Sequence, residues 1–320
     1  MPMSSKLTRK ITQLFSKAEP MDHLGVVLRQ GEVTYCYFPE NQPAKVDAIE
    51  LRASNYLQAL EQVSAEVSGQ CHLILSTEQY QIIQIDRPNV PDEEMHGALK
   101  WQVKDQVSFA PDEMVLDYYD GPTLAGGVEK LNVVCASSIA LKNFIAPLMN
   151  DNIQLKTITT PEFAFANLVP VHNDACLLVC QQPNEEILLL IVKDGQLFFH
   201  RRLRGFTHIA QASEQDLSMG LIDSLSLEIQ RSTDYFERQL KQAPIKSIQL
   251  VLPIHTEAYL AEKLAENTHI PVEILALPEP FSTQPSTWKP YAVAIAASML
   301  SKGLPQFIAE AKEDHAEGVA

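Results

Sequence analysis

The feature that most constrains the fold is a pattern of strands followed by helices that occurs in both halves of the chain. In the first half, residues 24–38 show a strand, turn and strand pattern with Gln30-Gly31 at the turn. In the second half, alternating apolar runs surround an Asp194-Gly195 turn, and apolar positions from 221 to 240 then recur at helical spacing. Two such units in one chain predict two similar α/β lobes.

A compact segment, residues 88–152, interrupts the first of these units. Asp92 begins a predicted helix whose apolar positions step by fours, and two strands follow around a Gly126-Gly127 turn. Ahead of this segment, a helix is expected over 49–67. We therefore expect a basic amphipathic N-terminal segment (1–20), a first lobe (21–87 and 153–172), an inserted subdomain (88–152), a second lobe (173–305) and an acidic tail (306–320).

Composition narrows the function classes. A chain of 320 residues with 46% hydrophobic residues can bury two sizeable cores. Its net charge of −15 opposes contact with nucleic-acid phosphates, so no nucleic-acid partner is expected. None of its apolar runs reaches the ~18–20 residues that span a bilayer, so the chain is expected not to be integral to a membrane.

The five cysteines are scattered, and most lie in apolar runs, so reduced core thiols are expected rather than disulfides or a metal site. They are Cys36, Cys71, Cys135, Cys176 and Cys180.

The first twenty residues are basic within an acidic protein. Lys6, Arg9 and Lys10 lie among apolar residues at helical spacing. One interpretation is a helix that lies on an anionic membrane surface, with these residues facing the lipid headgroups. The other is an ordinary terminal helix, and the sequence favours neither.

Five segments in register resemble the PilM-type family of type IV pilus assembly proteins. Order and spacing agree from about residue 20 to residue 304, which is nearly the whole chain. The segments are VPDEEM with ALKWQ (90–102), SFAPDEMVLDY (108–118), LKTITTPEFAFANL (155–168), FHRRLRGF (199–206) and LEIQRSTDYF (227–236).

The resemblance implies an actin-like ATPase fold of the ribonuclease H-like class, with two lobes and a small subdomain inserted in the first. It also implies a cytoplasmic protein peripheral to the inner membrane. Such proteins bind the cytoplasmic tail of a single-span inner-membrane pilus assembly protein. Within the family, biogenesis of the mannose-sensitive haemagglutinin (MSHA) pilus is the expected branch.

The loops that bind nucleotide in the family are altered here. The family's first loop aligns with residues 21–30, where Gly25 is retained but His23 replaces the Asp that organises Mg²⁺. The second loop aligns with 179–186, which has neither the Asp nor the Gly and contains Pro183. Bulky residues at 250–255 replace the Gly-Gly turn that seats adenine. We therefore expect a scaffold without catalytic residues, cofactor or metal rather than an enzyme.

The alternative is an actin-like ATPase that still binds ATP and Mg²⁺ and regulates pilus assembly. In that case Gly25 and the helix residues Glu228, Arg231 and Ser232 would contact the nucleotide. The competing interpretation of these three helix residues is an exposed face whose charged side chains pair with one another.

Two further groups of residues have alternative interpretations. The aromatic residues Trp101, Phe109, Tyr118 and Tyr119 either line a groove for the partner peptide or pack a core. The arginines at 201, 202 and 204 form either a polar face or a site for an acidic partner.

Overall fold

The computed structural model describes residues 22–39, 42–52, 55–121, 127 and 129–300. The expected N-terminal segment with Lys6, Arg9 and Lys10 and the expected acidic tail lie outside these residues.

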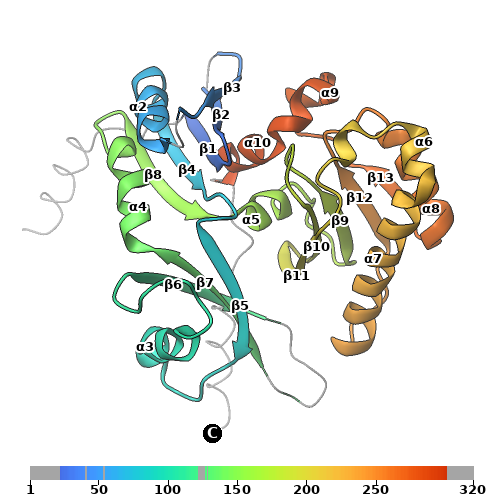
Figure 1. The fold of residues 1–320 in the computed structure, drawn as a ribbon, viewed down its shortest axis with the longest axis horizontal. Coiled ribbons are helices and arrows are strands. Elements are labelled where there is room, and N and C mark those ends of the chain that lie inside the picture. Colours follow the sequence, from blue (N-terminus) through green and yellow to red (C-terminus); the bar gives the residue numbers. More distant parts are fainter. Residues whose placement is uncertain (1–21, 40–41, 53–54, 122–126, 128, 301–320) are drawn as a thin grey trace, which may run out of the picture.

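Two five-stranded sheets share one strand order, as Figure 1 shows. In each, the first three strands form an antiparallel meander, and two later strands add in parallel beside the first. The first sheet has the order β3-β2-β1-β4-β8, from strands β1 (His23–Arg29), β2 (Glu32–Phe38), β3 (Lys45–Glu50), β4 (Gly69–Ile74) and β8 (Ile153–Thr159). The second has the order β11-β10-β9-β12-β13, from β9 (Cys176–Cys180), β10 (Ile187–Lys193), β11 (Gln196–Leu203), β12 (Ser247–Val251) and β13 (Val272–Ile274).

The predicted turns join the meander strands. Asp194 and Gly195 both have positive φ, 52° and 72°, the conformation that a two-residue hairpin between twisted strands requires. Gly31, with φ of 89°, follows Gln30 at the turn between β1 and β2.

A third sheet lies between β4 and β8 in sequence and forms a body of its own at the lower left of Figure 1. Its order is β5-β7-β6, from β5 (Tyr80–Asp86), β6 (Met114–Asp120) and β7 (Lys130–Ser137). Helix α3 (Asp92–Val103) buries Met95, Leu99 and Val103 against it, the positions expected from their spacing.

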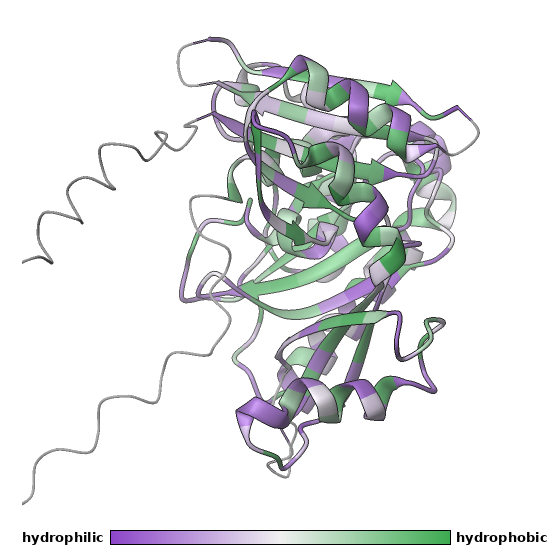
Figure 2. Cartoon of the chain, turned by 90° about the vertical axis from the view of Figure 1, so that its left-hand side faces the viewer, coloured by the Kyte–Doolittle hydropathy of each residue, from purple (hydrophilic) through white to green (hydrophobic). Residues whose placement is uncertain are grey.

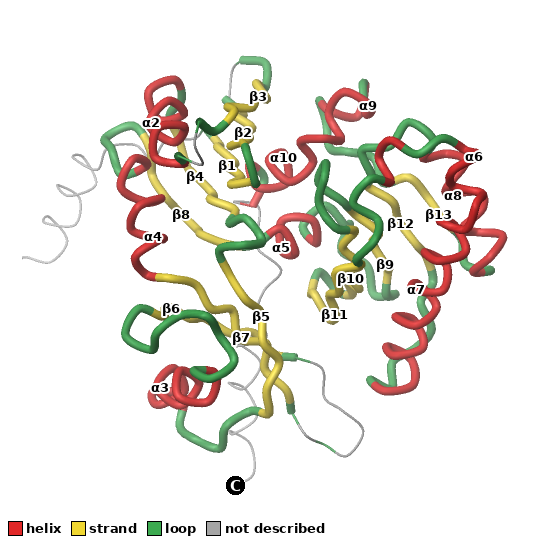
Figure 3. Tube along the Cα trace, viewed as in Figure 1, coloured by secondary structure: helices red, strands yellow, loops and turns green. Residues whose placement is uncertain are grey.

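Helices cover both faces of the two larger sheets (Figures 1 and 3). Outside the first sheet lie α2 (Tyr56–Glu66) and α4 (Ser138–Ile145), and outside the second lie α7 (Ile222–Asp234) and α8 (Glu257–Thr268). Between the sheets lie α5 (Pro161–Ala166) and α10 (Ala292–Ser298), whose residues are all buried. The shorter helices are α6 (Glu214–Asp216) and α9 (Pro285–Trp288).

One hydrophobic core therefore joins the lobes. It contains residues of α5 and α10 together with apolar side chains from both sheets, among them Val27, Ile74, Leu178 and Leu190. Figure 2, seen from the side of the first lobe and the third sheet, shows largely hydrophobic strands and helices that alternate between hydrophilic and hydrophobic positions. Each buried aliphatic side chain contributes ~1.5–3 kcal/mol, so the lobes stabilise one another.

The helix expected over 49–67 is wrong in its first part. Residues Lys45–Glu50 form β3, which pairs with β2, and the helix begins only at Tyr56. Charged and apolar residues alternate through β3, a pattern typical of a half-exposed strand at the edge of a sheet. The strand forms because β2 offers a free edge, a tertiary cause.

The cysteine prediction is confirmed, since all five are free and buried. Among the described residues, we find no helix that combines the length and the apolar character needed to cross a membrane.

Candidate functional site

Two regions could serve function: the junction of the lobes and a pocket beside the inserted subdomain. At the junction, the turn between β1 and β2 faces the turn between β9 and β10. Arg29, at the end of β1, is only 6% exposed and reaches the other lobe. Its guanidinium donates to the carbonyl of Pro183, and its Nε lies 3.6 Å from Oε1 of Glu185. Glu32 pairs with the same guanidinium, so Arg29 links the lobes.

Glutamine side chains fix the shape of the β9–β10 turn. Nε2 of Gln181 donates to the carbonyls of Glu185, at 2.7 Å, and Phe206, at 3.0 Å. Nε2 of Gln182 donates to Oε2 of Glu185 at 3.0 Å. Burial raises the pKa of Glu185, and the nearby Arg29 partly opposes this rise. The turn is thus built around an internal ion pair.

A second ion pair joins the lobes nearby. Arg202 of β11 donates to Glu162 of α5 at 2.6 Å and to the hydroxyl of Tyr80 at 2.9 Å. Tyr80 in turn donates to Glu162 at 2.7 Å. Burial alone raises the pKa of Glu162, but the Arg202 guanidinium outweighs it and the pKa lies below its usual value. Glu162 is therefore ionised within the interface.

The structure gives a packing reason for Gly25. It lies within β1 rather than at the turn, and α10 packs directly on it. A Cβ at this position would lie 2.2 Å from the carbonyl oxygen of Ala294 and 2.5 Å from the nitrogen of Ser298. Close contact with α10 is therefore sufficient to require a glycine here, and the nucleotide role of Gly25 stays a prediction. The strand expected from residue 24, with its turn at Gln30-Gly31, is confirmed, because His23–Arg29 forms β1 and pairs with β2.

The predicted nucleotide residues of α7 have partners within the protein. Glu228 pairs with Arg201 at 2.7 Å and with Arg231 at 2.6 Å. Ser232 is buried, and its hydroxyl donates to the carbonyl of Glu228 at 2.9 Å. Their nucleotide role stays a prediction. In the part of the chain that the structure describes, no group of three or more His, Cys, Asp or Glu residues is placed to hold a metal ion.

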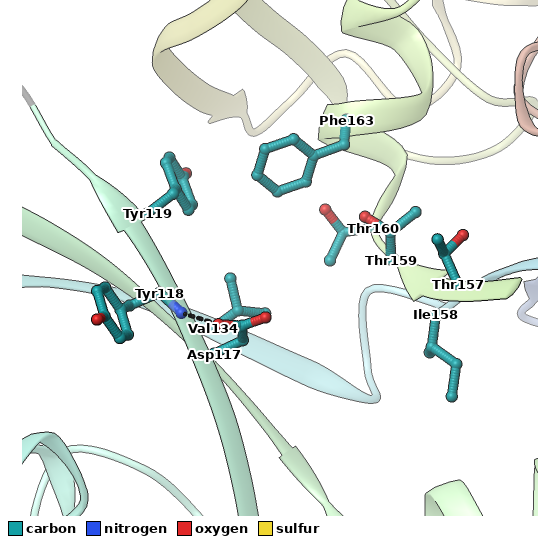
Figure 4. Close-up of a pocket in the computed structure, with 9 residues that line it drawn as sticks. All are labelled: Asp117, Tyr118, Tyr119, Val134, Thr157, Ile158, Thr159, Thr160 and Phe163. Atoms are coloured by element: carbon teal, nitrogen blue, oxygen red, sulfur yellow. Dashed lines mark hydrogen bonds between the residues drawn. The ribbon is translucent and has the colours of Figure 1, made fainter. Parts of the chain in front are cut away.

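The second region is a pocket of about 250 Å³ where the inserted subdomain meets the first lobe (Figure 4). Strands β6 and β7 form one wall, and the end of β8 with the start of α5 forms the other. Its lining residues are Asp117, Tyr118, Tyr119, Val134, Thr157, Ile158, Thr159, Thr160 and Phe163.

The pocket combines an apolar interior with hydroxyl groups. The rings of Tyr119 and Phe163 pack edge to face with centroids 5.0 Å apart. Burial raises the pKa of Tyr119, so its hydroxyl is neutral. Thr157 lies 2.8 Å from Nδ1 of His72 on β4, which holds the threonine in place.

Two strand edges meet at this pocket. Strand β6 is the outer strand of the three-stranded sheet, and β8 is the outer strand of the first large sheet. Outer strands carry backbone donors and acceptors that an extended peptide can use. The site therefore suits a peptide that adds along a strand edge and places an apolar side chain in the pocket.

The four aromatic residues singled out from the sequence do not gather at one place. Tyr119 lines the pocket, and Tyr118 lies at its margin with its ring against His96 of α3. Trp101 is 69% exposed on α3, with Nζ of Lys104 4.7 Å from its ring centroid. Phe109 packs against the core of the inserted subdomain. Trp101 and Phe109 thus lie outside this pocket.

Sequence reasoning did not single out Phe163 and the threonines of β8 as site residues. They lie within the 155–168 segment that resembles the family, and this resemblance was the sequence feature that could have identified them. Their meeting with β6 depends on how the inserted subdomain docks.

Comparison with known proteins finds no matching family model and no matching curated protein. Among solved structures, the chain is similar to a PilM–PilN type IV pilus biogenesis complex, with a TM-score of 0.63 and 16% identity over 88% of this chain and 98% of that chain. The cytoplasmic domain of EpsL, an inner-membrane component of the type II secretion system of Vibrio cholerae, gives a TM-score of 0.47 and 13% identity over 73% and 83%. A Bacteroides thetaiotaomicron protein with an actin-like ATPase fold and unknown function gives a TM-score of 0.49 and 11% identity, over 83% of this chain and 95% of that chain.

The chain has the actin-like ATPase fold, with two lobes and a small subdomain inserted in the first. This confirms the predicted fold class.

Proposed function

We propose that this protein is a cytoplasmic scaffold of a type IV pilus assembly platform at the inner membrane. In this proposal it binds the extended cytoplasmic tail of a bitopic membrane partner in the pocket between β6 and β8. The observation that carries the proposal is the meeting of two outer strands at a pocket lined by Tyr119 and Phe163. The fold shared with one chain of a pilus biogenesis complex supports it.

Within this function, we infer the MSHA branch, with an MshI-like role. The inference rests on the sequence resemblance alone. We also infer that the protein is not an ATPase, because Arg29 and Glu185 meet where two turns would face a phosphate chain. Calorimetry with Mg-ATP is expected to show weak binding at most. Turnover that disappears when Glu228 is replaced would contradict this inference.

A peptide-binding experiment tests the pocket. The probes are fluorescent peptides that represent the cytoplasmic tails of the host's bitopic pilus-platform proteins. Thr159→Arg places a guanidinium in the half-buried pocket wall, and Thr287→Arg makes the same change on the exposed surface of α9. Loss of a central anchor costs ~2 kcal/mol or more, so Thr159→Arg should weaken binding by about 30-fold.

Thr287→Arg should bind like the unaltered protein, and circular dichroism should show both variants folded. If Thr159→Arg binds a tail peptide as tightly as Thr287→Arg does, the peptide occupies another surface. Trp101→Ala extends the test, since this exposed side chain is a candidate for a second contact with the same partner.

A further inference from the structure

A second groove lies on the opposite lobe, at the outer strand of its sheet. It has a volume of about 540 Å³ and lies between the end of β11 and the first turns of α7. The lining residues are Arg201, Arg202, Leu203, Arg204, Gly205, Phe206, Leu221, Ser224, Leu227 and Glu228. The proposed peptide pocket shares none of them.

Apolar side chains lie exposed in and beside this groove. Leu227 is 46% exposed although it belongs to a helix that packs on the sheet. Met219, just before α7, is 74% exposed where Gly220, with φ of 112°, breaks the helical path. Leu203 and Phe206 are buried and form the floor. An apolar surface beside a groove is typical of a contact site.

The groove carries more positive than negative charge, in a chain whose net charge is −15. Arg201 and Arg231 share the single carboxylate of Glu228. The Arg204 side chain is 95% exposed, and its nearest carboxylate oxygen, from Glu186, is 3.9 Å away. Among the lining residues, Arg201 and Arg204 thus carry two positive charges against the one carboxylate of Glu228. Arg202 is not counted, because Glu162 neutralises it on the other side of the strand.

Strand β11 has an outer edge along which a further strand could pair. This strand ends the order of its sheet and pairs with β10 among the described strands. Its middle part, Phe198–His200, lines a separate cavity with Ile82 and Asn132 of the three-stranded sheet. Its last residues, Arg201–Leu203, line the groove instead.

We propose that this groove binds an extended acidic segment of a second protein partner, in which Glu or Asp residues alternate with aliphatic ones. The segment adds as a strand beside the end of β11. Its carboxylates pair with Arg201 and Arg204, because guanidinium groups bind carboxylates through paired hydrogen bonds. Its aliphatic residues cover Leu227. The scaffold would then hold two partners at once, one on each lobe.

Fluorescence anisotropy with the full chain tests the proposal. The probe is a labelled peptide of alternating Glu and Val, and the control probe replaces each Glu by Lys. The Glu peptide should bind, and its affinity should fall with added salt. The Lys peptide should not bind. Arg204→Glu should lower the affinity for the Glu peptide by at least about tenfold. Arg238→Glu is the matched control, because its side chain is 77% exposed outside the groove.

Three results would overturn the proposal. They are an absence of binding by the Glu peptide, an equal loss in Arg204→Glu and Arg238→Glu, and displacement of the peptide by equimolar ATP. The second would show an effect of total charge, and the third would assign the groove to a phosphate ligand. Leu227→Ser gives an independent measurement, since it removes the apolar contact without changing charge and should also weaken binding.

Discussion

The link between the lobes through Arg29 makes the sharpest stability prediction. In Arg29→Ala, the carbonyl of Pro183 loses its donor, and Glu185, whose side chain is 16% exposed, loses its cation. Removing one partner of a buried pair costs ~3–5 kcal/mol. Two features reduce this cost: Gln182 still donates to Glu185, and the raised pKa of Glu185 eases its protonation. We expect a loss of about 2–3 kcal/mol in the free energy of unfolding.

The assay is urea denaturation followed by circular dichroism, with Arg29→Ala, Glu185→Gln and the double variant in one cycle. The coupling energy between the two side chains should be ~1–2 kcal/mol. Arg238→Ala is the control, because its pair with Asp234 at 3.5 Å is exposed and should contribute less than ~1 kcal/mol. A coupling energy of zero, or equal losses in Arg29→Ala and Arg238→Ala, would refute the argument that this ion pair holds the lobes together.

Three further predictions concern packing, pH and the N-terminus. Gly25→Ala should lower the free energy of unfolding by ~1–3 kcal/mol, because the new Cβ meets the backbone of α10. Urea denaturation without any nucleotide measures this loss, and unchanged stability would contradict the packing role. Burial lowers the pKa of His72 to about 4, so between pH 6.5 and 4 the unfolded chain binds a proton that the folded chain does not, and stability falls as the pH drops. Between pH 7 and pH 5 the free energy of unfolding of the unaltered protein should fall by ~2 kcal/mol more than that of the His72→Asn variant. Equal falls in the two proteins would be evidence against this effect. If the N-terminal segment contacts lipid, flotation with anionic vesicles should fall when Lys6, Arg9 and Lys10 are all replaced by Glu, and unchanged flotation would leave an ordinary terminal helix.

Local patterns determined much of the fold. The Gln30-Gly31 and Asp194-Gly195 turns, the apolar spacing of α3 and the apolar runs of β9 and β10 depend on neighbouring residues, so the sequence alone identified them. Strand β3 was not predicted, although its charged and apolar residues alternate, because it is only six residues long and forms by pairing with β2.

The sequence by itself also showed that the nucleotide loops are altered, since missing Asp and Gly residues need no coordinates to detect. Only the tertiary structure showed what replaces them. Arg29 contacts Pro183 across 154 residues of sequence, and the local sequence around either residue does not predict this contact. The same holds for Tyr119 and Phe163, which different elements bring within 5.0 Å. Short-range periodicity encodes which face of a helix or strand is buried, whereas the pairing of faces depends on how the lobes and the inserted subdomain pack. The pocket between β6 and β8 lies at such a junction, and the groove between β11 and α7 lies where two elements of one lobe pack together.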